Sequence, residues 1–248
     1  MKNLVTFLIL LTTQFSISQT ISTDAPSVSA GATTVGGGIF QVESRLQYGQ
    51  IEGTQILQLP SNLFRLGIGD KFELRMTNGI TRREKLIDLD RMSLGFKAQL
   101  LNKPEGNTQI AFLFNAVLPD FKSNFYSGGG TFAVNHVIGD KSNIGYNVGY
   151  NYTSIGPAGS TIEYHSIFGS LIYSYALTDK LSLFSELYGG YINLTTMGIE
   201  TTSISFDCGF LYLVTDKFQI DYSYGLGLSD EHSFHAIGFN FMIGRKEK

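Results

Sequence analysis

The sequence is poor in cysteine, tryptophan and proline, and each scarcity limits what it can fold into. Its 248 residues include one cysteine, Cys208, five prolines and no tryptophan. A single cysteine cannot form an internal disulfide, which excludes a small fold held together by such bonds. Because proline cannot donate a backbone hydrogen bond, its scarcity leaves long stretches free to pair as strands.

Charged side chains and histidines are also few. The chain has 18 basic and 21 acidic residues, for a net charge of −3. This balance provides no basic face, so we expect no nucleic-acid partner. A metal site needs clustered histidine, cysteine or carboxylate side chains, and the chain has only four histidines, His136, His165, His232 and His235, and one cysteine. We therefore expect no metal and no other cofactor.

Long apolar runs are absent beyond the first residues. Met1-Lys2-Asn3 precedes the apolar run Leu4–Leu11, and small residues follow at Ser16 and Ser18. This pattern is typical of a secretory signal peptide, and the run is too short for a membrane-spanning helix. We expect residues 1–18 to form the signal peptide. No later stretch approaches the roughly 18 apolar residues of a transmembrane helix.

What the sequence does have is alternation with a period of two. Glycine (28), phenylalanine (19) and tyrosine (13) are abundant. In residues 144–152 the even positions are apolar or aromatic, whereas the odd positions are glycine or asparagine. Twelve segments show such alternation, each near the roughly 10 residues with which a tilted strand crosses a bilayer. The pattern predicts strands with one apolar face.

The connections between these segments fall into two groups. Four tight turns contain an Asp-Lys pair: Gly69-Asp70-Lys71, Gly139-Asp140-Lys141, Thr178-Asp179-Lys180 and Thr215-Asp216-Lys217. The connections between them are longer, apart from Ser229–Glu231: Gly49–Ser61, Asn78–Asp90, Pro119–Gly130, Thr153–Ile162 and Gly189–Thr202. Short turns at one end and longer loops at the other are typical of outer-membrane barrels.

The positions of the turns also predict how the strands pair. A hairpin centred on Asp179 sets Leu177 opposite Leu181 and Tyr175 opposite Leu183. One centred on Asp70 sets Ile68 opposite Phe72. A shift of one residue would move every apolar side chain to the wrong face.

These observations predict an all-β fold, a closed antiparallel transmembrane β-barrel of about 12 strands over residues 38–244. A flexible segment, 19–37, precedes it and a polar tail, 245–248, follows. Tyrosines and phenylalanines near both strand ends would form the interfacial belts. The alternative is a soluble secreted barrel with its apolar face inward, although twelve strands enclose more space than side chains fill. The membrane hypothesis places the protein in the cell outer membrane, with outer-membrane lipid and the barrel-insertion machinery as partners.

Several short motifs are shared with a known family. They are Thr23-Asp24-Ala25-Pro26-Ser27, Gly38–Glu43, Phe64–Ile68, Phe72–Arg75, Ser93–Lys97 and Gln219–Gly227. With them the chain resembles the outer-membrane transporter family named for the MetA pathway of phenol degradation. The resemblance implies a barrel tied to uptake of small organic molecules. The family's Asp-Arg-Pro is Asp24-Ala25-Pro26 here, so we assign no role to that motif.

If the apolar face meets lipid, the other face lines the lumen. The early strands would contribute Glu43, Arg45, Arg65, Glu73, Arg75, Arg91 and Lys97, and the late strands Glu186, Asp207 and Asp221. A basic wall opposite an acidic wall would produce a transverse field that favours polar or zwitterionic solutes. Alternatively, the opposed charges could pair and close the lumen. Both hypotheses stay open. Gln19–Gly37 could enter the lumen as a plug, but we favour a loose periplasmic tail.

The predicted function is passive or facilitated passage of small molecules, aromatic or polar organic ones included. It predicts channel conductance that Arg65→Ala or Arg75→Ala lowers or reshapes. One alternative is a closed structural or adhesive barrel without transport. Another is a lipid-modifying enzyme with a serine activated by histidine. Because His165-Ser166 and His232-Ser233 are neighbours on strands, their side chains point to opposite faces, so we do not expect an enzyme.

Overall fold

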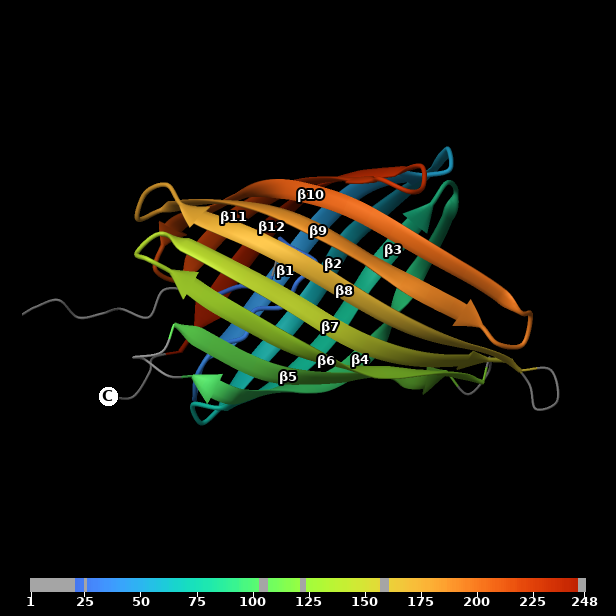
Figure 1. Cartoon of the computed structure of the whole chain (residues 1–248), viewed down its shortest axis with the longest axis horizontal. Helices are drawn as coiled ribbons and strands as arrows, with labels where there is room; N and C mark the ends of the chain where they lie inside the picture. The colour runs from blue at the N-terminus through green and yellow to red at the C-terminus, as the bar shows by residue number, and fades with distance from the viewer. Residues whose placement is uncertain (1–20, 25, 103–106, 121–123, 157–160, 245–248) are drawn as a thin grey trace, which may run out of the picture.

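The protein is a single closed β-barrel, here described from a computed structural model. The described residues are 21–24, 26–102, 107–120, 124–156 and 161–244. Twelve antiparallel strands each pair with their neighbours in the chain, and β1 pairs with β12 to close the barrel (Figure 1). The predicted fold class is confirmed. The predicted signal peptide and polar tail lie outside the described residues. Within the described ranges no helix is long and apolar enough to cross a membrane.

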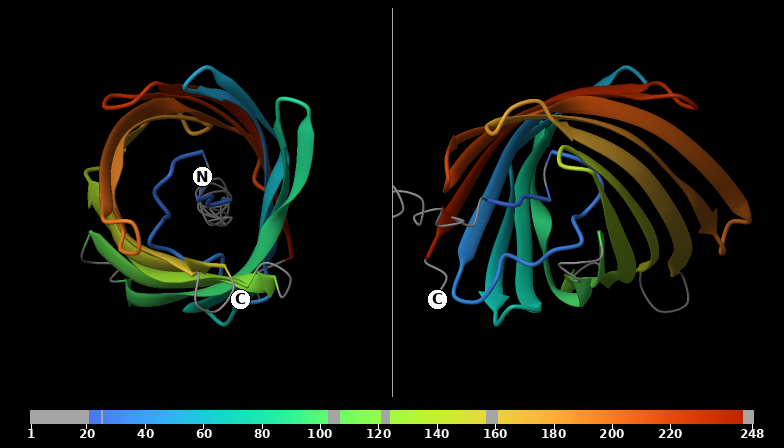
Figure 2. Two further views of the ribbon diagram at one scale, coloured as in Figure 1. Left: turned by 90° about the vertical axis from the view of Figure 1, so that its right-hand side faces the viewer. Right: turned by 60° about the vertical axis from the view of Figure 1, so that its left-hand side comes forward.

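The strands are tilted and follow one another around the barrel (Figures 1 and 2). Their bounds are β1 Phe40–Ile51, β2 Thr54–Ile68, β3 Phe72–Arg83, β4 Leu86–Asn102, β5 Thr108–Asp120, β6 Phe125–Ile138, β7 Ser142–Ile155, β8 Ile162–Ala176, β9 Leu181–Leu194, β10 Ile199–Thr215, β11 Phe218–Gly227 and β12 His232–Ile243.

The tight Asp-Lys turns set the register that their sequence predicts. Ile68 lies opposite Phe72, and Tyr175 lies opposite Leu183. The backbone N–H of Leu177 donates to the carbonyl of Leu181 at 2.9 Å. Both predicted hairpin registers are confirmed. Because the register fixes which face each residue occupies, these turns decide which side chains enter the lumen.

At the opposite end of the barrel the strands are longer than predicted. Only Glu52 and Gly53 separate β1 from β2, and both have positive φ, 47° and 81°, as a two-residue hairpin requires. Most of the predicted link Gly49–Ser61 is therefore strand, and so is most of Asn78–Asp90. The register shifts between Gln58 and Ser61 and between Thr77 and Gly79. Such bulges interrupt the period-two pattern, which conceals the strands in the sequence.

The apolar side chains face outward and the charged ones inward. Val148 and Leu74 are 58% and 46% exposed, whereas Glu73 is fully buried and Arg75 nearly so. A soluble barrel would show the opposite distribution. The exterior therefore meets lipid, and the barrel spans a membrane. One polar row interrupts this exterior, where Ser44, Asn62 and Asn78 are hydrogen bonded across β1, β2 and β3.

The lipid-facing assignment can be tested at Val148, near the middle of β7. Val148→Arg would place a charge near the bilayer centre, where it costs about 2–4 kcal/mol of folding free energy. Ser166→Arg on the inward face of β8 is the matched control and should cost much less. Urea unfolding in lipid vesicles measures both changes. Equal losses in the two variants would contradict the assignment.

Candidate functional site in the barrel lumen

Residues 21–24 and 26–39 lie inside the barrel, and we call them the luminal segment (Figure 2). Ile21, Val35 and Ile39 pack with Met242 of β12 in an apolar cluster. Further along the segment, Ala32 packs against Ala111 of β5 and Ala133 of β6. The expectation of a loose periplasmic tail is therefore wrong for the described part of this segment. The physical reason lies in the charges that it meets.

Asp24 of the luminal segment lies among three basic side chains. Its carboxylate receives hydrogen bonds from Arg75 Nη1 at 2.6 Å and from Lys97 Nζ at 2.9 and 3.0 Å. Arg65 Nη1 is 3.9 Å away. The sheet places these bases together, since Arg65 pairs directly with Arg75 across β2 and β3. Like charges in directly opposed positions repel, so a carboxylate between them is stabilising.

Glu43 and Glu73 complete the cluster. Arg65 donates to Glu73 at 2.8 and 2.9 Å and to Glu43 at 2.8 Å. Arg75 also donates to Glu73 at 2.8 Å. Among the described residues the cluster thus holds three bases and three carboxylates, all buried. The charges balance only because Asp24 joins the two glutamates of the wall.

The other side of the luminal segment is bound to the late strands. The backbone N–H groups of Val28 and Ser29 donate to Glu186 of β9 at 2.7 and 2.8 Å, and the Ser29 hydroxyl donates to it as well. Ser29 Oγ also lies 2.6 Å from Ser170 Oγ of β8. Ala30 exchanges two hydrogen bonds with the Asn147 side chain. The luminal segment therefore connects the basic wall to the acidic wall.

The structure brings together most of the predicted lumen residues. Those buried inside the barrel are Glu43, Arg65, Glu73, Arg75, Lys97, Glu186, Asp207 and Asp221. Arg45 is partly exposed, 3.8 Å from Asp221. Arg91 is exposed and stands over the Phe125 ring at 4.0 Å, away from the cluster.

Among the described residues, the basic and the acidic wall meet directly at Arg45 and Asp221. The luminal segment lies between them, and each wall binds it separately. On the acidic wall Asp207 lies directly opposite Glu186, and Asp221 accepts a hydrogen bond from Asn240 at 2.6 Å. Within the part of the chain that the structure describes, no group of His, Cys, Asp and Glu side chains is arranged to hold a metal ion.

The histidines lie away from this network. His165 and His235 contact the hydroxyls of Tyr150 and Tyr222 at 2.5 and 2.7 Å, in exposed pairs of adjacent strands. His136 contacts Thr108 at 2.9 Å. These side chains occupy the exterior rather than the lumen, where each contacts a tyrosine of a neighbouring strand.

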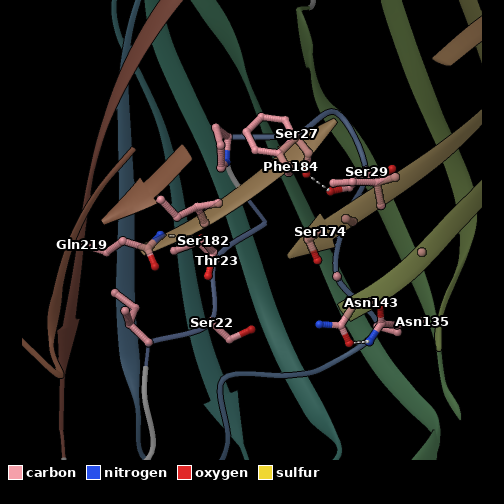
Figure 3. Close-up of a pocket in the computed structure, with 18 of the residues that line it drawn as sticks. Ser22, Thr23, Ser27, Ser29, Asn135, Asn143, Ser174, Ser182, Phe184 and Gln219 are labelled. Atoms are coloured by element: carbon pink, nitrogen blue, oxygen red, sulfur yellow. Dashed lines mark hydrogen bonds between the residues drawn. The ribbon is translucent and has the colours of Figure 1, made fainter. Parts of the chain in front are cut away.

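Two cavities adjoin the luminal segment. The larger, about 480 Å³, lies between the segment and β6–β11 and reaches Asp179 and Lys180 at a tight turn (Figure 3). The smaller, about 270 Å³, lies against β1–β3 and is lined by Arg45, Arg75 and Asp24 among others. The segment thus lines both spaces and contributes to their walls.

Sequence reasoning missed Asp24 and Ser29, which fix the luminal segment in place. One signal was available, because Asp24 is the only charged residue between Gln19 and Gly37. A lone carboxylate in a stretch of small residues, before strands rich in arginine, could have indicated a partner in the lumen. Ser29 carried no such signal, since serines are common in the segment.

An apolar exterior, a charged interior and twelve tilted strands define this protein as an outer-membrane β-barrel. Residues 23–243 match the family described as "Putative MetA-pathway of phenol degradation". The chain belongs to this family, and the resemblance found in the sequence is confirmed.

Solved structures of other barrels share the fold. The COG4313 outer membrane channel from Pseudomonas putida F1 superposes with a TM-score of 0.70 at 12% identity, covering 88% of this chain and 100% of that one. The NanC porin gives 0.61 at 8% identity, with 81% and 98% covered. The KdgM porin in complex with disordered oligogalacturonate gives 0.52 at 10% identity, with 81% and 98% covered. A search of curated protein sequences finds no match.

Proposed function

We propose that this protein is an outer-membrane channel for small molecules whose lumen is closed by the luminal segment. The observation that carries the proposal is the position of Asp24, which is bonded to Arg75 and Lys97 inside the barrel. Membership of the family and the likeness to barrels named as channels and porins support transport as the activity. Passage then requires the segment to leave at least one of its two walls.

The charged residues have a different role in the closed and open states. In the closed state Arg75 and Lys97 hold Asp24, and Glu186 holds the backbone of Val28 and Ser29. When the segment leaves, these side chains regain water and line the pore. The pore-lining set is then Glu43, Arg45, Arg65, Glu73, Arg75, Lys97, Glu186, Asp207 and Asp221, with Arg91 nearer the outer end.

A reversible covalent lock tests whether the segment must move. Ser29 and Ser170 have hydroxyls 2.6 Å apart, so cysteines at both positions should form a disulfide between segment and wall. Cys208→Ser removes the native thiol. We expect the oxidised double variant to pass little current in planar bilayers, and reductant to restore it. Each single cysteine variant is a control that reductant should not affect.

The same measurement separates the channel from a closed structural barrel. If current is equal before and after reduction, movement of the segment is not needed for passage. If neither form conducts and liposomes containing the protein do not swell in small solutes, the barrel is closed and the channel proposal fails.

A further inference from the structure

The larger luminal cavity is lined almost wholly by uncharged side chains. At about 480 Å³ it falls within the usual range for small-molecule sites. Figure 3 shows hydroxyl and amide side chains of the luminal segment and of β6–β9 and β11 around it. Charged side chains enter the lining only at Asp179 and Lys180, in the tight turn at the mouth. This cavity is chemically unlike the ionic cluster beside it.

Several polar groups of the lining have no partner among the described residues. The Asn143 amide accepts from Asn135 at 3.5 Å, but its own N–H groups donate to no described residue. Gln219 donates to Thr23 at 2.9 Å, which leaves its carbonyl oxygen unpaired in the described structure. The hydroxyls of Ser174 and Ser182 likewise make no described hydrogen bond. The cavity thus offers donors and acceptors to a solute.

An apolar wall faces these groups. Phe184 of β9 is 5% exposed, and Ile172 and Leu211 also line the cavity. Gly209 makes this possible, since a Cβ there would come within 2.8 Å of the Phe184 ring. Apolar side chains beside hydroxyl and amide groups match a ring that has apolar faces and a hydroxylated edge.

The lack of charge selects against ions. An ionised solute would lose hydration in this cavity and would meet an opposite charge only at the turn of Asp179 and Lys180, and burying an unpaired charge is costly. A hydroxyl group exchanges its hydrogen bonds with water for bonds to serine, asparagine and glutamine. We propose that this cavity is a binding site for a small uncharged hydroxylated ring, a proposal that rests on the proposed channel function. A monosaccharide and a dihydroxybenzene share this chemistry.

Equilibrium binding to the purified full chain in detergent tests the site. The probes are glucose, catechol and glucuronate, which is glucose with a carboxylate added. We expect glucose or catechol to bind, and the one that binds more tightly identifies the source of the ring. Glucuronate should bind at least tenfold more weakly than glucose. The site is wrong if neither neutral probe binds or if glucuronate binds as well as glucose.

Matched variants locate the binding in this cavity. Ser174→Ala and Asn143→Leu each remove an unpaired group and should weaken binding roughly three- to tenfold. Ser166→Ala and Asn151→Leu lie on the same strands and the same inward faces but outside the cavity, and should leave binding unchanged. Equal losses in both sets would overturn the assignment. Folding of each variant is checked by heat-modifiable electrophoretic mobility.

A filling variant and measurements on the unmodified chain keep the two proposals separable. Ser182→Phe should abolish binding by occupying the cavity without removing the other polar groups. Binding and conduction are also both measured on the unmodified chain. If the chain binds a probe but never conducts, the binding-site proposal stands and the channel proposal fails. If the chain conducts but binds no probe, the channel proposal stands and the binding-site proposal fails.

Discussion

Asp24→Ala is expected to open the channel. The substitution leaves Arg75 and Lys97 without the carboxylate that they share inside the barrel. Removing one partner of a buried ion pair costs about 3–5 kcal/mol, and here the cost falls on the closed state. The ratio of closed to open channels should therefore fall roughly 10²- to 4 × 10³-fold, at about 1.4 kcal/mol for each factor of ten. Single-channel recording in planar bilayers measures this ratio.

Asp230→Ala provides a control, since Asp230 is an exposed carboxylate between β11 and β12. Its removal should leave the ratio of closed to open channels unchanged. If Asp24→Ala retains the closed dwell times of the unmodified chain, the ion pairs do not hold the luminal segment in place.

The same geometry reverses one prediction made from the sequence. With Arg75 as a free residue of the pore wall, the sequence predicts that Arg75→Ala lowers or reshapes the conductance. In the structure Arg75 is bonded to Asp24 and Glu73. Its removal should release the luminal segment and raise the open fraction, although Lys97 still holds Asp24 and the effect should be smaller than that of Asp24→Ala.

Arg65→Ala is expected to destabilise the whole barrel. Arg65 is only 1% exposed, and it binds Glu43, Glu73 and the carbonyl of Ser22. Without it, two buried glutamates lose their main counter-charge, which should lower the free energy of unfolding by about 3–5 kcal/mol. The midpoint of urea unfolding in lipid vesicles measures the loss.

Two further variants make this result specific. Arg65→Lys retains the charge but lacks the planar fork that reaches both glutamates, so it should recover only part of the stability. Arg82→Ala, at the exposed end of β3, should change the free energy of unfolding by less than about 0.5 kcal/mol. If Arg65→Ala is as mild as Arg82→Ala, the cluster does not contribute to stability as we infer.

The ionic cluster shows why a polar lumen needs the luminal segment. Buried polar networks are stabilising when every member is paired and costly when one is left alone. The walls supply Arg65, Arg75 and Lys97 against Glu43 and Glu73, which leaves one excess positive charge. Asp24 removes that excess, and the N–H groups beside it satisfy Glu186 on the other wall. The segment is thus held by electrostatic balance on two sides.

The sequence by itself determined the strands, their exposed faces and the registers at the tight turns. Alternation and turn chemistry are local properties, since neighbouring side chains on a strand point to opposite faces and Asp70 or Asp179 fixes the hairpin around it. Where bulges interrupt the alternation, as near Thr77, the sequence pattern predicts loops in place of strands.

Only the tertiary structure decided what fills the lumen. Asp24 lies 51 positions from Arg75 and 73 from Lys97, and Ser29 lies 157 from Glu186. Apart from the lone carboxylate of Asp24, nothing in the sequence of residues 21–39 distinguishes a tail from a plug. A plug forms because closure of the barrel brings distant charges to one place. A pattern along the sequence does not contain the distances between strands of the folded barrel.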